Sequence, residues 1–223
     1  MIVLGIDTAT RFADVAIVRD GDLVAQARSD AHGRGTDLLV LIDRICAEAK
    51  LSARELDAVA IGAGPGSFTS LRIGMATAKG IAFAAGKPLW AVSSLAALAD
   101  PGPGERVAGV LDARRGEVYA GVFVRDGDRV APLGDERTLP PDQVAALGAT
   151  RYVGDAGAAY PLLAALPGAW DRTPTGAAVA RLAVAGSRAD VLVTGVPAYL
   201  RRAEAEILYP DGVPGALRKR PGV

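Results

Sequence analysis

The chain has 223 residues, half of them hydrophobic, which is enough for one large domain or two modest ones with an adequate core. Lysine plus arginine and aspartate plus glutamate both total 25, so the formal net charge is zero and no basic excess indicates direct nucleic-acid binding. A single cysteine, Cys46, excludes an intramolecular disulfide; because Asp7 interrupts the apolar start and no stretch is long enough to span a membrane, we expect a cytoplasmic protein.

One strand pattern occurs twice along the chain. Residues 3–24 and 109–130 each contain an apolar strand that ends in an aspartate, Asp7 or Asp112, then a short polar turn and a second apolar strand. Both segments then reach the same Arg-Asp-Gly-Asp turn, and Asp-Gly between apolar runs is a strong hairpin signal because glycine adopts positive φ readily. The repeat therefore predicts two similar halves that each open with a β-meander, although any two hairpins share some likeness.

After the first meander, strand and helix alternate, which is typical of an α/β fold. The apolar spacing over residues 36–50 predicts a helix that Thr36 or Asp37 caps and that packs one face on the sheet. The elements predicted next are a strand over 58–63, a helix over 67–85, a strand over 89–92 and a short helix over 94–99.

A Pro-Gly-Pro-Gly run at residues 101–104 breaks all regular structure and marks the junction between the halves. We therefore predict an N-terminal half over 1–101, a C-terminal half over 105–195 and a C-terminal segment over 196–223 that is loose beyond Pro210. The helices predicted in the second half cover residues 142–147, 156–166 and 175–187.

Residues 61–74 read as a strand that enters a glycine-rich turn and opens a helix. Free N–H groups and the positive end of the helix dipole meet at such a turn and can hold an anion. The candidate contacts for an anion, or for a nucleotide at a subunit interface, are Asp7, Thr8, Gly64, Gly66 and Ser67. The turn lacks the Gly-Lys-Ser/Thr of a Walker loop, so a tight strand-to-helix turn with Ser67 as N-cap is the simpler interpretation.

Two glycines, Gly74 and Gly80, interrupt the predicted helix over 67–85 among larger apolar residues. A glycine in a helix costs about 1 kcal/mol relative to alanine, so its presence indicates a close neighbour. The pattern leaves open whether that neighbour belongs to the same domain or to another subunit.

The segment Asp7-Thr8-Ala9-Thr10 is similar to the first phosphate loop of actin-like ATPases and kinases, which are built from two such halves. That loop needs glycine so that backbone can approach phosphates, but Ala9 occupies the place here, and the equivalent turn at 112–116 also lacks the glycine pair. Asp7 is either catalytic or, as we expect, an aspartate that caps the hairpin or faces a helix.

The sequence offers little for catalysis or for a metal. His32 is its only histidine, which excludes a histidine metal pair, and we expect it in an exposed loop rather than in a Ser-His-Asp or Cys-His arrangement. Cys46 lies among apolar helix positions and reads as a core residue. Glu204 and Glu206 lie beside two arginines and read as a solvated charged stretch.

Four blocks of sequence together resemble the TsaB/YeaZ family and span nearly the whole chain in the family's order. They are Leu-Gly-Ile-Asp-Thr-Ala-Thr at 4–10, Gly-Pro-Gly-Ser-Phe-Thr-Ser-Leu-Arg-Ile-Gly at 64–74, Asp-Ala-Arg-Arg-Gly-Glu-Val-Tyr at 112–119 and Pro-Ala-Tyr-Leu-Arg at 197–201. The second block is far more specific than a generic glycine-rich turn.

The resemblance implies the duplicated actin-like (ASKHA, ribonuclease H-like) fold and a non-catalytic subunit of the machinery that makes N6-threonylcarbamoyladenosine in tRNA. Such a subunit binds and activates TsaD, which carries the metal-binding histidines and the active site, and the ATPase TsaE joins the pair. The resemblance also implies a homodimer when the chain is isolated, contact with tRNA through the complex, no cofactor or metal of its own, and ATP or ADP, if anywhere, at the complex interface.

By the same resemblance, the partner surface lies on the helices over 36–50 and 67–85. The residues expected there are Leu38, Leu41, Ile42, Ile45, Leu71, Arg72, Gly74, Met75, Ala78 and Lys79. The family usually has a histidine and a glutamate or glutamine near the start of the first helix, where this chain has Gly35-Thr36-Asp37, so the role of those positions stays open.

Two enzyme classes are the alternatives. An actin-like small-molecule kinase or ATPase would need the phosphate-loop glycine that Ala9 replaces, and a protease-like hydrolase would need metal ligands or a triad.

Overall fold

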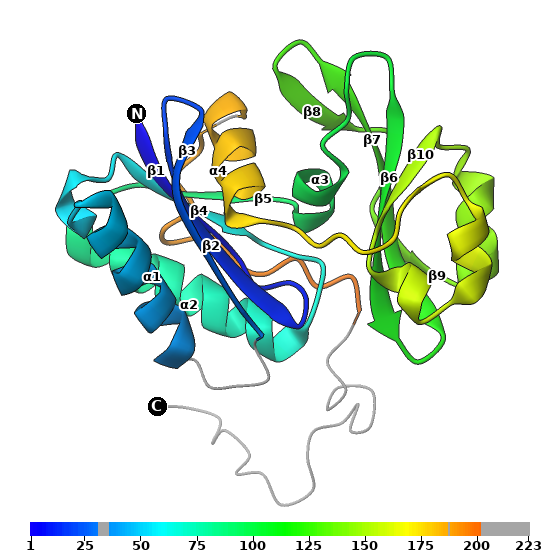
Figure 1. Ribbon diagram of the computed structural model, residues 1–223, viewed down its shortest axis with the longest axis horizontal. Helices are drawn as coiled ribbons and strands as arrows, with labels where there is room; N and C mark the ends of the chain where they lie inside the picture. The colour runs from blue at the N-terminus through cyan, green and yellow to red at the C-terminus, as the bar shows by residue number, and fades with distance from the viewer. Residues whose placement is uncertain (31–35, 187, 202–223) are drawn as a thin grey trace, which may run out of the picture.

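The chain folds into two α/β halves that lie side by side, each built on its own sheet (Figure 1). The computed structural model describes residues 1–30, 36–186 and 188–201. The loop that holds His32 and the tail from residue 202 onward lie outside the described residues, as do the side chains of Thr36 and Asp37 that we considered as caps.

The first sheet contains five strands in the order β3-β2-β1-β4-β5. The strands are β1 (Ile2–Asp7), β2 (Phe12–Arg19), β3 (Asp22–Asp30), β4 (Ala58–Gly62) and β5 (Leu89–Val92). The first three form an antiparallel meander, and β4 and β5 continue the sheet parallel to β1. The predicted Asp-Gly turn joins β2 to β3, with positive φ at Asp20 (53°) and Gly21 (94°).

The second sheet repeats this arrangement in the order β11-β10-β6-β7-β8, with β9 paired to β7. Its strands are β6 (Arg106–Arg114), β7 (Glu117–Asp126), β8 (Arg129–Pro132), β9 (Arg137–Leu139), β10 (Arg151–Gly154) and β11 (Gly168–Ala169). Strands β6, β7 and β8 form the antiparallel meander, and β10 and β11 run parallel to β6. Because both strand order and strand direction repeat, the predicted duplicated actin-like fold is confirmed.

Two helices cover one face of the first sheet: α1 (Thr36–Ala49) and α2 (Phe68–Ala85), which lie side by side (Figure 1). A short 3-10 turn, η1 (Ala53–Glu55), leads from α1 to β4. The buried positions of α1 are Leu38, Leu41, Ile42 and Ile45, the spacing of one helix face. Among the helices in the described part of the chain, none is long and apolar enough to cross a membrane.

The two halves exchange a helix. α3 (Ser94–Ala99) follows β5 of the first sheet but packs on the second sheet, where Leu95 and Leu98 join the core. α4 (Gly176–Ala185) follows β11 of the second sheet but packs on the first, on the face opposite α1 and α2 (Figure 1). The predicted halves therefore match the two copies of the sequence repeat. In the folded chain, however, each half is completed by one helix from the other copy.

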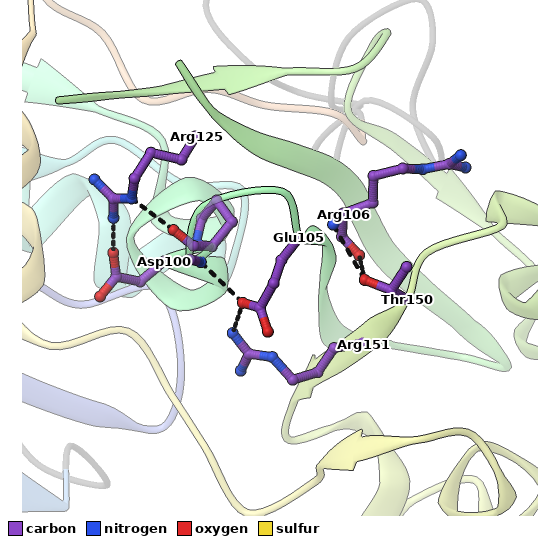
Figure 2. A network of polar contacts seen from close by, with 8 residues as sticks. Asp100, Glu105, Arg106, Arg125, Thr150 and Arg151 are labelled. Atoms are coloured by element: carbon purple, nitrogen blue, oxygen red, sulfur yellow. Dashed lines mark hydrogen bonds and ion pairs between the residues drawn. The ribbon is translucent and has the colours of Figure 1, made fainter. Parts of the chain in front are cut away.

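The Pro-Gly run does not lie where the chain passes between the halves. The chain reaches the second sheet with α3, before residues 101–104, and those residues are held on the second half by arginines from its strands (Figure 2). Arg125 donates to the Asp100 carboxylate (2.7 Å) and to the Pro101 carbonyl (2.7 Å). Arg151 pairs with Glu105 (2.9 Å), so arginines hold residues 100–105 at both ends.

The second half has less helix than predicted. Residues 142–147 and 156–166 form only short 3-10 turns, η2 (Pro141–Leu147), η3 (Ala156–Ala158) and η4 (Pro161–Ala165). A continuous helix over 156–166 is therefore wrong. The physical reason is Pro161, which has no N–H to donate and holds Tyr160 before it in an extended conformation (φ −129°, ψ 90°).

Candidate functional site

The carboxyl group of Asp7 is buried where β1 ends, and only 1% of the residue is exposed. Its Oδ1 accepts the Ala9 N–H (2.8 Å) and its Oδ2 accepts the Ser94 hydroxyl (2.6 Å). The carboxyl group fills the space beside the neighbouring strand β4, because a Cβ at Gly62 would overlap Asp7 Oδ2. Asp7 thus caps the turn after β1 and ties it to the first residue of α3.

Burial raises the pKa of Asp7 to about 7, although the hydrogen bonds from Ser94 and Ala9 oppose the rise. The nearby Asp14 adds to the rise, since it faces Asp7 across the β1–β2 pair. Both oxygens of Asp7 are engaged inside the protein. This is the capping arrangement that we expected, rather than a carboxylate presented to a ligand.

A second buried carboxylate, Asp14, was missed from the sequence. Its Oδ1 accepts the Gly176 N–H (2.8 Å) at the start of α4 and the Gln26 side chain (2.9 Å). Burial raises its pKa, against these two hydrogen bonds. The signal was present in β2, where Asp14 is the charged member of an otherwise apolar run, Phe-Ala-Asp-Val-Ala-Ile-Val. A charge inside a buried strand indicates a fixed partner.

The glycine-rich turn closes onto the turn after β1. The Ser67 N–H donates to the Ala9 carbonyl (2.8 Å), the Gly64 N–H donates to the Ser94 hydroxyl (3.2 Å), and Gly66 lies so close that a Cβ would overlap the Ala9 carbonyl. The structure therefore brings together the residues considered for an anion, from Asp7 to Ser67. However, the N–H groups of Gly64 and Ser67 are donated within the protein itself, so an anion contact there stays a prediction.

The close neighbour of Gly74 is the chain's own Thr8. A Cβ at Gly74 would overlap Thr8 Oγ1, and the Thr8 hydroxyl donates to the Ser70 carbonyl (2.9 Å) one turn earlier in α2. Gly80, by contrast, has nothing within 4 Å of where its Cβ would lie. The sequence located a tight contact correctly, but that contact is with the first strand-end turn and not with a partner's helix.

Most of the residues expected at a partner surface are core residues of this chain. The buried ones are Leu38, Leu41, Ile42, Ile45, Leu71, Gly74, Met75 and Ala78. The apolar spacing that suggested them is the stripe by which α1 and α2 pack on the first sheet, so it does not form an exposed surface. Only Arg72, which is exposed, and Lys79, which is half-buried, reach the surface.

Other apolar residues do face solvent on these two helices. Leu39 is 54% exposed, Val40 66% and Phe83 78%. Ala76 and Gly80 are exposed small residues on α2. We call these five residues the outer face of α1 and α2. Large exposed apolar side chains gathered on neighbouring elements mark interaction sites in soluble proteins.

The strand-end turn of the second half is closed in the same way as that of the first. Asp112 Oδ1 accepts the Arg114 N–H (2.7 Å) and the Tyr160 hydroxyl (3.2 Å), and Asp112 also pairs with the Arg114 side chain (3.2 Å). The Asp112 N–H donates to Asp155 Oδ1 (3.0 Å), and burial raises the pKa of Asp155. The strand-end carboxylates Asp7 and Asp112 are therefore both hydrogen-bonded within the chain.

Metal and nucleophile chemistry gain no support from the described residues. Within residues 1–30, 36–186 and 188–201, no group of three or more His, Cys, Asp or Glu side chains is placed to hold a metal ion. Cys46 packs at the edge of the first core, and burial raises the pKa of its thiol, which disfavours the reactive thiolate. Glu204 and Glu206 lie outside the described residues.

Comparisons with known proteins agree on one family. A family model described as TsaD, tRNA N6-adenosine threonylcarbamoyltransferase, matches residues 28–159. An uncharacterized protein of Mycobacterium tuberculosis is 37% identical over 92% of this chain and 94% of its own length. The tRNA threonylcarbamoyladenosine biosynthesis protein TsaB of Escherichia coli is 36% identical, over 56% of each chain.

Two solved structures match nearly the whole fold. One is described as an uncharacterized protein with similarity to peptidase YEAZ from Pseudomonas aeruginosa; it has a TM-score of 0.78 and 30% identity and covers 90% of this chain and 99% of its own. The other, YeaZ from Pseudomonas aeruginosa, has a TM-score of 0.76 and 28% identity over 89% of this chain and 99% of its own.

Asp7→Asn should change how stability depends on pH. The folded chain holds the Asp7 proton more tightly than the unfolded chain, so this group's contribution to the free energy of unfolding is full at low pH and falls as pH rises from about 4 to about 7. The loss is on the order of a few kcal/mol. Asparagine can keep the hydrogen bond from the Ala9 N–H and does not titrate.

Urea unfolding of both proteins at several pH values should show the wild type losing stability relative to Asp7→Asn between about pH 4 and pH 7. A difference in stability that stays constant with pH would contradict the raised pKa of Asp7.

Gly74→Ala and Gly80→Ala should shift stability in opposite directions. The methyl group at position 74 meets Thr8, so the free energy of unfolding should fall by roughly 1–3 kcal/mol. At position 80 the space is open, so alanine should raise it by up to about 1 kcal/mol through helix propensity. Chemical denaturation measures both, and a Gly74→Ala variant as stable as the wild type or more stable would show that Gly74 does not pack on Thr8.

Proposed function

We propose a role in tRNA threonylcarbamoyladenosine biosynthesis for this chain, which belongs to the TsaB/YeaZ family. More specifically, we propose that it is a non-catalytic subunit that binds TsaD and enables that protein to transfer the threonylcarbamoyl group to tRNA. The observation that carries this proposal is the exposed apolar outer face of α1 and α2 on a chain whose strand-end carboxylates are capped internally.

The two strand-end turns favour a chain that does not catalyse a reaction alone. In a kinase of this fold class, the turn after the first strand must leave room for phosphates, and a carboxylate must be open to their metal ion. Here Asp7 has both oxygens engaged and Ala9 occupies the turn. Asp112 is likewise hydrogen-bonded by Arg114 and Tyr160. These contacts favour a structural role for both aspartates.

The outer face of α1 and α2 favours partner binding. Burying a side chain as exposed as Phe83 stabilises an association by roughly 1.5–3 kcal/mol, and Val40 and Leu39 would add to this. The small residues Ala76 and Gly80 would let a partner's helix approach α2 closely. Arg72 and Lys79, which the sequence also suggested, lie on the same helix at its surface and would contribute polar contacts at the edge.

The remaining partners follow from family membership. We propose that the same outer face pairs two copies of the chain when TsaD is absent, since an apolar surface is stabilised by covering it. TsaE would join the TsaD pair, and tRNA would be contacted through the complex. Any ATP or ADP site would need residues from the partner, because the turn N–H groups of Gly64 and Ser67 are already donated within this chain.

Phe83→Glu should abolish pairing with TsaD while leaving the chain folded. The side chain is 78% exposed, so the change costs the isolated chain little, whereas a carboxylate buried at an interface without a partner is strongly unfavourable. We expect the dissociation constant, measured by calorimetry with TsaD of the same organism, to rise at least about a hundredfold. Leu162→Glu, a matched change at a 53% exposed leucine of the second half, should bind as the wild type does.

Thermal unfolding of each variant serves as the folding control. If Phe83→Glu binds TsaD with wild-type affinity, or if Leu162→Glu weakens binding equally, the outer face of α1 and α2 is not the partner surface.

The isolated chain should bind magnesium and ATP weakly or not at all. The reason is that the Asp7 carboxylate and the N–H groups of Gly64 and Ser67 are hydrogen-bonded within the protein. Titration calorimetry with the purified chain tests this. Submicromolar binding, or steady hydrolysis by the chain alone, would overturn the non-catalytic assignment and favour an actin-like kinase or ATPase.

A further inference from the structure

Residues 188–201 run along the first half, and Arg201 contacts the second (Figure 1). This segment first pairs with Leu89 at the start of the edge strand β5: the Val191 N–H donates to the Leu89 carbonyl (2.8 Å), and the Asp190 carboxylate accepts the Leu89 N–H (3.0 Å). Farther on, Lys79 of α2 donates to the Val193 carbonyl (3.4 Å). These contacts fix the segment to the first half.

The segment then attaches to the glycine-rich turn and to the start of α2. The Ala198 N–H donates to the Ala63 carbonyl (2.7 Å). The Tyr199 ring packs on the Phe68 ring with 4.8 Å between centroids, and its hydroxyl accepts from Arg72 Nε (3.0 Å). The Arg72 guanidinium in turn lies 3.8 Å from the centre of the Phe68 ring. Tyr199 is therefore held by packing, a hydrogen bond and a cation–π contact.

Two residues later the chain reaches the second half. Arg201 donates through Nη1 to the Ala113 carbonyl (2.9 Å) and through Nη2 to the Glu117 carboxylate. Ala113 and Glu117 flank the turn between β6 and β7. A guanidinium that is hydrogen-bonded at once to a carbonyl and to a carboxylate is fixed in direction as well as in position.

These contacts connect the four blocks by which the sequence resembles its family. Thr8 and Ala9 of the first block contact Gly74 and Ser67 of the second. The fourth block joins the second through Tyr199, by way of Phe68 and Arg72. It joins the third through Arg201, by way of Ala113 and Glu117. The blocks therefore form one continuous series of contacts from the first half to the second.

Within the described residues, the halves are also linked where the main chain crosses, between β5 and α3 and between β11 and α4, and by the packing of those helices. Ala9 and Leu71 of the first half add apolar contacts, because they join the core of the second half. Two halves joined by main-chain crossings can move as a hinge, whose closure depends on the remaining contacts. The contact through Arg201 is polar and depends on one guanidinium group, so the loss of Arg201 or of its carboxylate partner Glu117 can release it.

We propose that residues 198–201 form a strap that sets the orientation of the two halves. Tyr199 anchors the strap on α2, and Arg201 holds the hairpin between β6 and β7. Four residues span at most about 14 Å, so the distance between the two anchors cannot change much while both are in place. Loss of Arg201 frees the second half to rotate about the two crossings.

The test measures the distance between the halves by pulsed electron spin resonance. Spin labels are attached at Leu23→Cys on β3 and at Leu162→Cys on η4, two leucines that are 46% and 53% exposed, in a chain in which Cys46 is replaced by alanine. The labelled chain is diluted with unlabelled chain so that only distances within one molecule are recorded. The wild type should give one narrow distribution.

Arg201→Ala should broaden that distribution roughly twofold and shift its mean, because the hinge is released. Glu117→Gln keeps the shape of the side chain but removes its charge, and it should broaden the distribution in the same direction. The double variant should match Arg201→Ala, since both changes break one contact. Arg151→Ala, which removes an arginine–carboxylate pair within the second half, is the matched control and should leave the distribution unchanged.

The strap is overturned if Arg201→Ala and Glu117→Gln both leave the distribution at its wild-type width and mean. The proposal is equally overturned if Arg151→Ala broadens the distribution as much as Arg201→Ala does. The broadening would then come from the loss of any arginine–carboxylate pair and not from release of the strap. Should Arg201→Ala fail to fold, Glu117→Gln alone decides between these outcomes.

Discussion

The fold depends on one carboxyl group that is shut away from water. Asp7 lies at the end of β1, and Ser94, which donates to it, is the first residue of α3, where the chain passes to the second sheet. A buried carboxyl group that lost its hydrogen bonds would destabilise the protein by several kcal/mol. The turn at Ala9, the missing side chain at Gly62 and the crossing at Ser94 are therefore constrained together.

Sequence patterns predicted the parts of the fold that depend on local spacing. The two meanders and the bounds of α1 and α2 follow from alternation, from helical periodicity and from the Asp-Gly turns. The exchange of α3 and α4 could not be predicted, because periodicity shows that a helix has an apolar face but not which sheet that face covers. Gly74 illustrates the same limit: a glycine in a helix signals a close neighbour, yet the neighbour, Thr8, is distant in sequence.

The proposed partner surface shows a related ambiguity, which the sequence pattern of α1 could have resolved further. Residues 38–42 are five consecutive apolar residues, Leu-Leu-Val-Leu-Ile, which is wider than one helix face. The sheet covers Leu38, Leu41 and Ile42, and the remainder, Leu39 and Val40, is left outside. A helix with apolar residues beyond a single stripe has two surfaces to cover, and the second needs something other than its own sheet.

The helix that carries most of the outer face is also held firmly from within. α2 contacts Thr8 through Gly74, the strap through Arg72 and Phe68, and the Val193 carbonyl through Lys79. A helix fixed in this way presents a preformed surface, so little ordering opposes association. The same contacts run on to Asp7 and Ser94 in one direction and to Arg201 in the other. A partner bound to α2 could therefore favour one orientation of the second half by some factor. Linkage then requires that this orientation raise the partner's affinity by the same factor.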